Sequence, residues 1–353
     1  MHTVVQSGAT EASKSGDTQD SSVALARVAI AGATGFTGQE LLRLLSRHPA
    51  VTLTAAMSSG QTGASSRRLP ALARVWHGTI VPLSPAALAS DADVVFLALP
   101  DAAAADLAPA LVDAGVRVID LSGAFRLRDE AARAKWYPDT HRLPAGLAYG
   151  LTERERGAIA RAQFVANPGC YPTATLLALS PLAEAGLLAA NSDVIVDAKS
   201  GVSGAGKTPS ERTHFSEIHG SMAAYGVFNH RHGAEIEQGI GRTVTFTPHL
   251  IPIDRGILST IYVRVAPGTT EEAIGDVLEQ AYKGATFVRL VGSSLPEIKH
   301  VAHTNFCDIG WRVDPSGRVI LVSVIDNLLK GASGQAVQNM NVMLGLDERT
   351  ALL

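Results

Sequence analysis

The chain has 353 residues, of which 46% are apolar and 18% charged, and its formal net charge is −3. This balance lacks the basic surface that attracts nucleic acids or anionic membranes, so we expect neither as a partner. A chain of this length predicts about two domains. Two cysteines are too few for a disulfide framework and indicate the reducing cytoplasm.

Residues 1–23 are rich in Ser, Thr, Gly and Asp and contain no apolar segment typical of a signal peptide. We expect a disordered tail there. The most apolar stretches, 94–112 and 174–190, are interrupted by acidic residues and proline. Neither is expected to cross a bilayer.

The N-terminal half alternates apolar runs with amphipathic periodicity. Together they predict strands at 23–31, 51–57, 75–81, 94–99 and 116–120, and helices at 39–48 and 102–114. Because strand and helix alternate, we expect a parallel sheet with helices on both faces.

Beyond residue 170 the strands become longer, with period-two alternation. This pattern favours an α+β domain with a mostly antiparallel sheet, so the fold class is α/β followed by α+β. The predicted elements are strands at 194–199, 242–247, 256–265 and 318–325 and helices at 270–283 and 334–346.

The last helix is expected to pack back on the first domain. The chain then divides into a tail (1–23), a first domain (24–168 and 331–353) and a second domain (169–330). The long strands of this last domain offer surface for self-association, so we expect a homo-oligomer, either a homodimer or a homotetramer.

A glycine-rich loop, Gly-Ala-Thr-Gly-Phe-Thr-Gly, joins the first predicted strand to the first predicted helix. Its glycines stand at offsets 0, 3 and 6, where the usual dinucleotide fingerprint has 0, 2 and 5. The N–H groups at the start of such a helix can still bind a pyrophosphate. We therefore expect the first domain to be a Rossmann-type dinucleotide-binding domain. The predicted cofactor-binding residues are Gly32, Thr34, Gly35, Phe36, Thr37 and Gly38.

The end of the second predicted strand indicates which dinucleotide binds. An Asp or Glu there would accept a hydrogen bond from the ribose of NAD and repel the 2′-phosphate of NADP. This chain has Ser58 and Ser59 instead, with Arg67 and Arg68 nearby. We therefore expect NADP(H), with the two arginines either close to the phosphate or simply solvated.

Cys170 lies in the segment Asn-Pro-Gly-Cys-Tyr-Pro-Thr, where a turn at Pro168 and Gly169 precedes an apolar helix opening near Pro172. The partial positive charge of a helix start lowers a thiol pKa and favours a nucleophilic thiolate. A buried, inert cysteine is the alternative. Beside a nicotinamide, a thiolate can hold an acyl group as a thioester, which allows acyl compounds and aldehydes to interconvert.

This chemistry also needs a general acid/base, and either His232 or His230 can supply it. Glu235, three residues after His232, is expected to orient its ring. These histidines, with His214 and His219 upstream, can alternatively bind a metal ion. No carboxylate stands at a typical ligand spacing, so we expect no metal.

Two further motifs point to other enzyme classes. Residues 201–208 match the phosphate-loop pattern G-x-x-x-x-G-K-[ST], but a polar, turn-like segment follows instead of an apolar helix, which favours a glycine-rich active-site loop. Short-chain dehydrogenases need Tyr-x-x-x-Lys, and none of the six tyrosines has a lysine four residues on.

Six stretches resemble N-acetyl-gamma-glutamyl-phosphate reductases of the arginine pathway, which have a semialdehyde-dehydrogenase-like fold. The resemblance implies that Cys170 attacks an acyl phosphate, that NADPH reduces the thioester to a semialdehyde, and that a histidine donates the proton. It also implies that residues 169–330 form a catalytic and dimerisation domain, that Asn327, Gly334 and Gln335 lie by the cofactor, and that Ser122 and Arg126 hold the substrate. The similar stretches are 32–38, 120–127, 165–174, 199–206, 230–236 and 326–339.

Three positions depart from the family pattern: Asp101 replaces a His, Thr152 a Pro and Ala234 a Pro. None is expected to touch the chemistry. Aspartate-semialdehyde dehydrogenases remain an alternative, although their cysteine usually follows Asn without the Gly-Cys-Tyr-Pro-Thr run. A regulator that lost catalysis and a carrier-bound aminoadipyl substrate are further alternatives.

Overall fold

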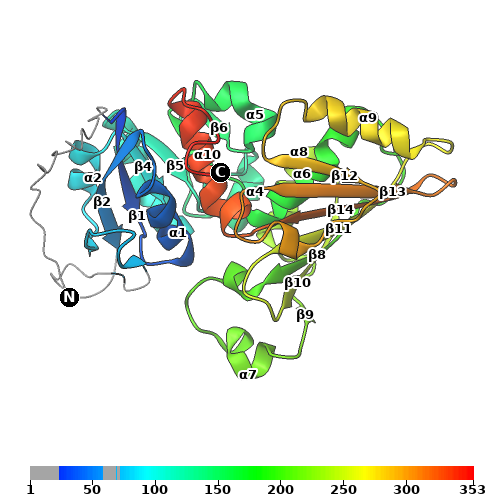
Figure 1. Ribbon diagram of the computed structural model, residues 1–353, viewed down its shortest axis with the longest axis horizontal. Coiled ribbons are helices and arrows are strands. Elements are labelled where there is room, and N and C mark those ends of the chain that lie inside the picture. Colours follow the sequence, from blue (N-terminus) through cyan, green and yellow to red (C-terminus); the bar gives the residue numbers. More distant parts are fainter. Residues whose placement is uncertain (1–23, 59–68, 70–71) are drawn as a thin grey trace, which may run out of the picture.

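The computed structural model describes residues 24–58, 69 and 72–353 (Figure 1). The expected tail at 1–23, together with Ser59, Arg67 and Arg68, lies outside the described residues. Two seven-stranded sheets form the body of the molecule, in agreement with the expected α/β and α+β classes.

The first sheet is parallel throughout, with strand order β3-β2-β1-β4-β5-β7-β6. Its strands are β1 (Ala26–Ala31), β2 (Val51–Ser58), β3 (Val81–Pro82), β4 (Val94–Leu97), β5 (Arg117–Asp120), β6 (Leu147–Tyr149) and β7 (Phe164–Ala166). The helices of this part are α1 (Phe36–Leu45), α2 (Pro85–Asp91), α3 (Asp101–Asp113), α4 (Glu130–Trp136), α5 (Thr152–Ile159) and α10 (Gly334–Met343).

Both faces of this sheet are covered, which explains the continuous apolar runs in its central strands. Along β1, Val28 and Ile30 pack into one core with α1 and α10, whereas Ala29 and Ala31 pack into another core with α2 and α3. The strand predicted at 75–81 is wrong for most of its length. Only Val81 and Pro82 form β3, because β2 offers only its last two residues for pairing at this edge.

The second sheet is mixed, with strand order β12-β13-β14-β11-β8-β10-β9. Two neighbouring pairs, β12 with β13 and β8 with β10, are parallel, and the other four are antiparallel. The strands are β8 (Ile195–Gly201), β9 (Ala223–Ala224), β10 (Thr245–Ile251), β11 (Ile257–Arg264), β12 (Val288–Gly292), β13 (Cys307–Val313) and β14 (Arg318–Ile325).

One face of the second sheet packs on helices, and α6 (Cys170–Glu184) forms the centre of this core. Every residue of α6 from Tyr171 to Leu182 is buried, as its apolar sequence requires. Two further helices, α8 (Arg231–Ile240) and α9 (Glu271–Ala281), pack beside it.

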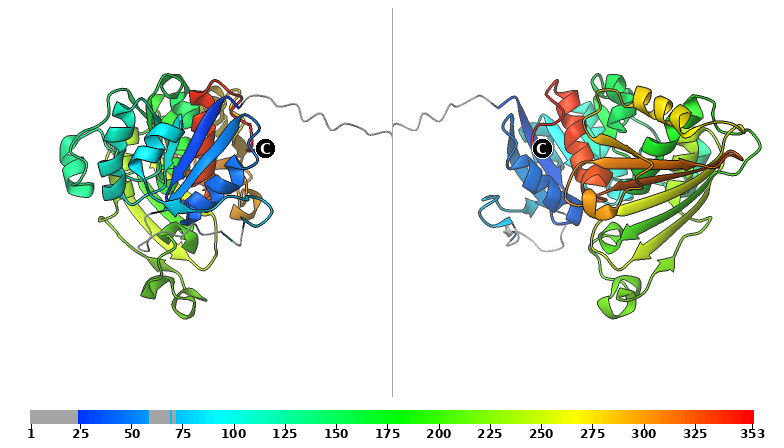
Figure 2. Two further views of the ribbon diagram at one scale, coloured as in Figure 1. Left: turned by 90° about the vertical axis from the view of Figure 1, so that its left-hand side faces the viewer. Right: turned by 45° about the vertical axis from the view of Figure 1, so that its right-hand side comes forward.

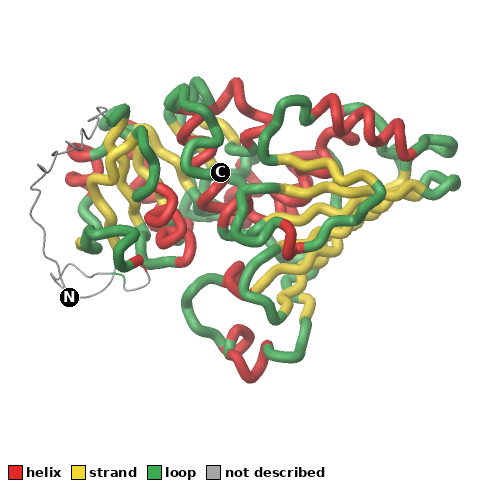
Figure 3. The backbone as a smooth tube through the Cα atoms, viewed as in Figure 1, coloured by secondary structure: helices red, strands yellow, loops and turns green. Residues whose placement is uncertain are grey.

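Residues 202–229 form an arm that projects beyond the second sheet and consists mostly of loop (Figure 3). The arm contains the short elements η2 (Val202–Ala205), η3 (Glu211–Thr213) and α7 (Phe215–Ile218), as well as strand β9. Its first residues lie close to the 32–38 loop of the first sheet, since Lys207 contacts Thr34.

A short 3-10 turn, η4 (Ile298–His300), joins β12 to β13 within the second sheet. After β14, the last strand of that sheet, the chain returns to the first sheet through a π-helical turn, η5 (Leu329–Ser333). Helix α10 follows this turn and lies between the two sheets (Figure 2). Its Ala336, Val337 and Met340 belong to the core of the first sheet. This packing supports our proposal that 24–168 with 331–353 form one domain and 169–330 the other.

Candidate active site

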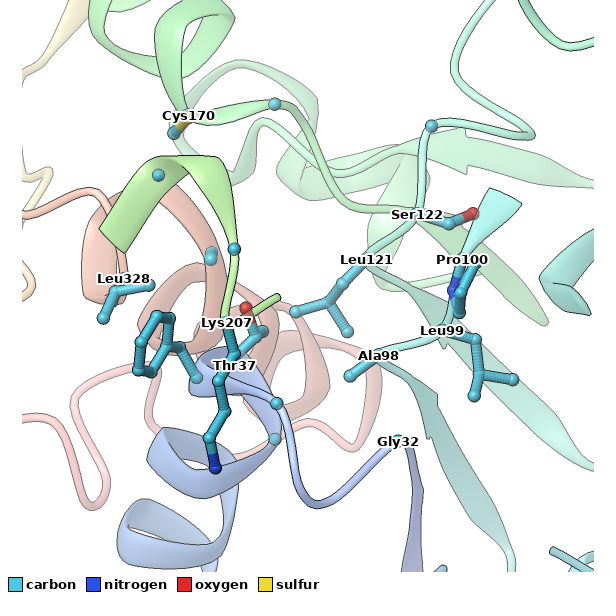
Figure 4. A pocket seen from close by; sticks show the side chains of 18 of the residues that line it. Gly32, Thr37, Ala98, Leu99, Pro100, Leu121, Ser122, Cys170, Lys207 and Leu328 are labelled. Atoms are coloured by element: carbon cyan, nitrogen blue, oxygen red, sulfur yellow. The ribbon is translucent and has the colours of Figure 1, made fainter. Parts of the chain in front are cut away.

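A cavity of about 940 Å³ lies at the carboxyl ends of the parallel strands, where open α/β sheets bind ligands. Both proposed domains contribute to its walls, and Figure 4 shows Cys170 facing the loop of Gly32 across it. The walls comprise the 32–38 loop, Ser58, the loops at 98–101, 121–126, 167–170 and 203–209, Arg231, His232 and the segment 327–332.

The glycine loop lines this cavity as expected, with Thr34, Gly35, Phe36 and Thr37 all in its wall. Gly32 has φ of +93°, and a Cβ there would lie 2.1 Å from the Ala98 carbonyl oxygen. A Cβ on Gly38 would lie 2.3 Å from the Gly32 oxygen. The glycines therefore let the backbone fold tightly around the start of α1.

Helix α1 starts at Phe36, and no side chain caps its N-terminus. Its first N–H groups therefore remain able to bind an anion in the cavity. Ser58, at the end of β2, lies next to this loop, because its Oγ is 3.1 Å from Thr34 Oγ1. This geometry fits a dinucleotide.

Asn327 lies in the cavity wall, where its side chain binds the Gly256 N–H and Ser203 Oγ at 2.7 and 3.0 Å. Gly334 and Gln335 lie behind the wall instead. Gln335 is fully buried and donates to Thr173 Oγ1 at 3.0 Å. The π-helical turn presents other residues of the same segment to the cavity, namely Leu328, Gly331 and Ala332.

Cys170 is the first residue of α6, so the helix starts two residues earlier than the sequence indicated. The turn before it is held by a bond from the Gly169 N–H to Glu235 Oε1 at 2.9 Å. On the other side, a Cβ on Gly331 would lie only 2.8 Å from the Cys170 Cβ. The cysteine is therefore held between a helix start and a glycine backbone, with its side chain lining the cavity.

The expectation of a lowered thiol pKa is wrong for the free protein. Burial raises the pKa of Cys170 to about 11, although Arg126 and the Tyr171 N–H act to lower it. Loss of solvation therefore outweighs the partial charge of the helix start. A base must therefore remove the thiol proton when the sulfur reacts.

His232 is buried and lies beside this turn: a Cβ on Gly169 would be 2.5 Å from His232 Nε2. Burial, His230 and nearby arginines lower the pKa of His232 well below its usual value, so its ring is neutral. The His232 Nδ1 atom has no hydrogen-bond partner among the described residues. A neutral imidazole in this position can accept a proton.

His230 has a different position. It is the N-cap of α8, where its Nδ1 accepts the His232 N–H at 3.1 Å, and its ring packs against Tyr171, Tyr225 and Phe246. It does not line the cavity. Of the two histidines, the structure therefore favours His232 for proton transfer.

Glu235 does not orient the His232 ring. Its Oε1 accepts bonds from the Tyr149 hydroxyl and the Gly169 N–H, and its Oε2 lies 3.5 Å from Arg126 Nη1. Glu235 lies about one turn after His232 in α8 and contacts the cysteine turn instead of the ring. It thus links the turn before Cys170 to Arg126.

Ser122 and Arg126 both line the cavity. Ser122 Oγ donates to Asp120 Oδ2 at 2.8 Å, and burial raises the pKa of Asp120 to about 6. Arg126 donates through Nε to the Asn167 oxygen at 2.8 Å and through Nη2 to the Leu121 oxygen at 2.9 Å. The guanidinium is thus fixed in orientation, with N–H groups left over to bind an anion.

Asp101 was expected to lie away from the chemistry, but it lines the cavity. Its Oδ1 accepts the Gly123 N–H at 2.6 Å, and its Oδ2 pairs with Arg231. The sequence signal for this ion pair, which our prediction missed, is the position of Arg231 between the two histidines. No group of three metal-ligating side chains occurs within the described ranges, and no helix in that part is long and apolar enough to span a bilayer.

Two family models match the chain: "Semialdehyde dehydrogenase, NAD binding domain" at residues 27–162 and "Semialdehyde dehydrogenase, dimerisation domain" at residues 170–327. Among solved structures, aspartate semialdehyde dehydrogenase II from Vibrio cholerae has a TM-score of 0.70 at 21% identity, covering 91% of this chain and 98% of that one. The enzyme from Candida albicans, solved with NADP, has a TM-score of 0.63 at 16% identity, covering 90% and 98%. Fold and matched domains thus define a semialdehyde dehydrogenase.

More similar relatives identify the family. The N-acetyl-gamma-glutamyl-phosphate reductase of Syntrophobacter fumaroxidans is 47% identical over 92% of this chain and 97% of that protein. The protein of the same name from Brevibacillus brevis is 46% identical over 93% and 98%. The chain belongs to the N-acetyl-gamma-glutamyl-phosphate reductase family.

Proposed function

We propose that this protein reduces N-acetyl-gamma-glutamyl phosphate to N-acetylglutamate 5-semialdehyde and phosphate, with Cys170 as nucleophile and NADPH as reductant, in arginine biosynthesis. One observation carries the proposal: the thiol of Cys170 and the imidazole of His232 line the same cavity as the glycine loop. The relatives with this reductase name align over nearly the whole chain, which supports the same substrate.

The cofactor would be held by the 32–38 loop and Ser58 on one side and by Leu328, Gly331 and Ala332 on the other. The uncapped start of α1 suits a pyrophosphate. Ser58 leaves room for a 2′-phosphate where an acidic residue would repel it, which favours NADP over NAD. Bound NADPH supplies the hydride that reduces an acyl thioester.

Residues of the chain carry out the acyl-transfer and proton-transfer steps. Cys170 attacks the acyl carbon while His232 takes the thiol proton. The new C–S bond forms as the C–O bond to phosphate breaks, and His232 returns the proton to the leaving phosphate. The N–H groups of Cys170 and Tyr171, which already favour the charged sulfur, would stabilise the oxyanion that develops on the acyl oxygen.

After reduction, the C–S bond breaks to release the aldehyde, and the sulfur regains a proton delivered from solvent through His232. Arg126, held by two carbonyls and Glu235, would bind a carboxylate of the substrate, with Ser122 beside it. His230 and Glu235 would act by positioning, His230 as the cap of α8 and Glu235 as the link between the cysteine turn and Arg126.

The outer face of the second sheet supports a homodimer or homotetramer. Ile195, Tyr262 and Ile320 each expose between 37% and 39% of their surface there, next to a further cavity. The match to a dimerisation domain points the same way. We also place the protein in the cytoplasm, where Cys170 and Cys307 stay reduced. Light scattering tests the assembly, and a monomer would contradict it.

The function is tested in the oxidative direction, by phosphate-dependent reduction of NADP⁺ with N-acetylglutamate semialdehyde. Cys170→Ser should lower kcat by at least about a thousandfold. Cys307→Ala is the matched control, because Cys307 lies in the core of the second sheet, away from the cavity, and this variant should stay active. Equal activity of Cys170→Ser and wild type would refute the thioester. Faster turnover of a carrier-bound aminoadipyl semialdehyde would refute the substrate.

A further inference from the structure

The segment 201–208, which matches a phosphate-loop pattern in sequence, does not form a phosphate loop. Strand β8 ends at Gly201, and only four residues of 3-10 helix follow before the chain turns at Gly206, whose φ is +86°. This turn directs Lys207 away from the second sheet and into the wall of the cavity. Figure 4 shows its side chain running toward the glycine loop.

Lys207 therefore crosses from the catalytic domain to the dinucleotide-binding domain. Its Nζ donates to the Thr34 carbonyl oxygen at 3.1 Å. An ammonium group has three N–H donors, so two remain for a ligand. Lys207 forms no ion pair with any described residue, whereas Arg126 and Arg231, the other cationic residues in the cavity wall, face Glu235 and Asp101.

The neighbours of Lys207 indicate which part of a dinucleotide it would meet. Thr34 Oγ1 is 3.1 Å from Ser58 Oγ, and Ser58 is the last residue of β2. The end of this strand is where a dinucleotide-binding domain places the adenosine ribose, whereas the pyrophosphate lies at the start of α1. A cation beside Thr34 and Ser58 is thus suited to a phosphate on the ribose.

We propose that Lys207 completes a binding site for the 2′-phosphate of NADP, together with Ser58 and the side chain of Thr34. This inference rests on the proposed function and extends it, because it assigns the choice between NADP and NAD to a residue of the other domain. The nucleotide then holds the two domains together through Lys207, and NADP selection depends on their arrangement.

Equilibrium binding tests the proposal without turnover. Isothermal titration of NADP⁺ and NAD⁺, and of 2′,5′-ADP and 5′-AMP, separates the ribose phosphate from the pyrophosphate. Lys207→Met should weaken NADP⁺ and 2′,5′-ADP by about tenfold or more, since a charge-assisted bond to phosphate is lost. Binding of NAD⁺ and 5′-AMP should not change. Lys207→Arg should retain most of the NADP⁺ affinity, because it keeps the charge.

Lys283→Met is the matched control, since Lys283 is an exposed lysine in the turn after α9 and does not line the cavity. It should bind all four ligands like wild type. An equal loss of NADP⁺ and NAD⁺ affinity in Lys207→Met would place the lysine at the pyrophosphate and overturn the proposal, as would no loss. If wild type binds NADP⁺ more tightly than NAD⁺, either of these results refutes only the role of Lys207. A wild type that binds the two nucleotides equally well refutes the role of Lys207 and also NADP as the cofactor.

Discussion

Gly331 is the residue whose replacement tests most directly how the cysteine is held. Its backbone lies in the π-helical turn with a φ that is not positive, so alanine is sterically allowed by the backbone itself. The added Cβ would lie 2.8 Å from the Cys170 Cβ and 3.2 Å from Ile325 Cδ1. Carbon atoms pack best at about 3.5–4.0 Å, so Cys170 must move by roughly 1 Å.

A displacement of this size misplaces the nucleophile. We expect Gly331→Ala to lower kcat/KM by about a hundredfold, the loss typical of a 1 Å misplacement. Overpacking should also lower the free energy of unfolding by about 1–3 kcal/mol. Steady-state kinetics of the phosphate-dependent oxidation and urea unfolding measure the two effects separately.

Gly157→Ala is the matched control, since Gly157 lies in α5 and a Cβ there would come no closer than 3.8 Å to Arg161. This variant should keep its kcat/KM and its stability, or gain about 0.4–1 kcal/mol. If Gly331→Ala has the kcat/KM of wild type, the backbone of η5 does not set the position of the thiol, and the argument from close packing is refuted.

Two further outcomes follow from buried ionisable groups. Burial raises the pKa of Cys170 to about 11, so its alkylation by iodoacetamide in the free protein should still accelerate between about pH 8 and 10. Cys170→Ser gives the background rate. A rate that is already constant near neutral pH would show a preformed thiolate and contradict the raised pKa. The side chains of Lys330 and Glu153 are 0% and 1% exposed and form an ion pair at 2.6 Å. Lys330→Met should therefore lower the free energy of unfolding in urea by about 3–5 kcal/mol, and adding Glu153→Gln should recover part of this loss. A loss under about 1 kcal/mol in Lys330→Met would contradict a buried ion pair. Burial acts to raise the pKa of Glu153, but Lys330 holds it below its usual value, so this stabilisation is present above the unfolded-state pKa and is lost as pH falls through the folded-state pKa.

Local sequence signals were sufficient for the parts of the site that a single segment builds. The glycine loop was predicted from one strand, one turn and one helix, and the structure places its six predicted cofactor-binding residues at the cavity. The position of Cys170 at a helix start followed from Pro168, Gly169 and the apolar run behind them. These features depend on backbone geometry within about ten residues, where periodicity and turn residues carry the information.

Contacts between distant segments could not be predicted in this way. Glu235 was expected to orient His232 and instead binds the cysteine turn and Arg126. Gln335 was expected at the cofactor and instead donates to Thr173 of α6, because every residue of α10 is buried. These contacts join segments that are far apart in the sequence, so no local pattern indicates them.

The glycine loop, the thiol before an apolar helix and the family resemblance could all be read from the amino-acid sequence alone. The raised thiol pKa, the pairing of Asp101 with Arg231 and the contact of Lys207 with Thr34 became visible only in the folded chain. Desolvation and charge pairing sum over atoms from many segments, so these properties exist only after the chain has packed around one cavity.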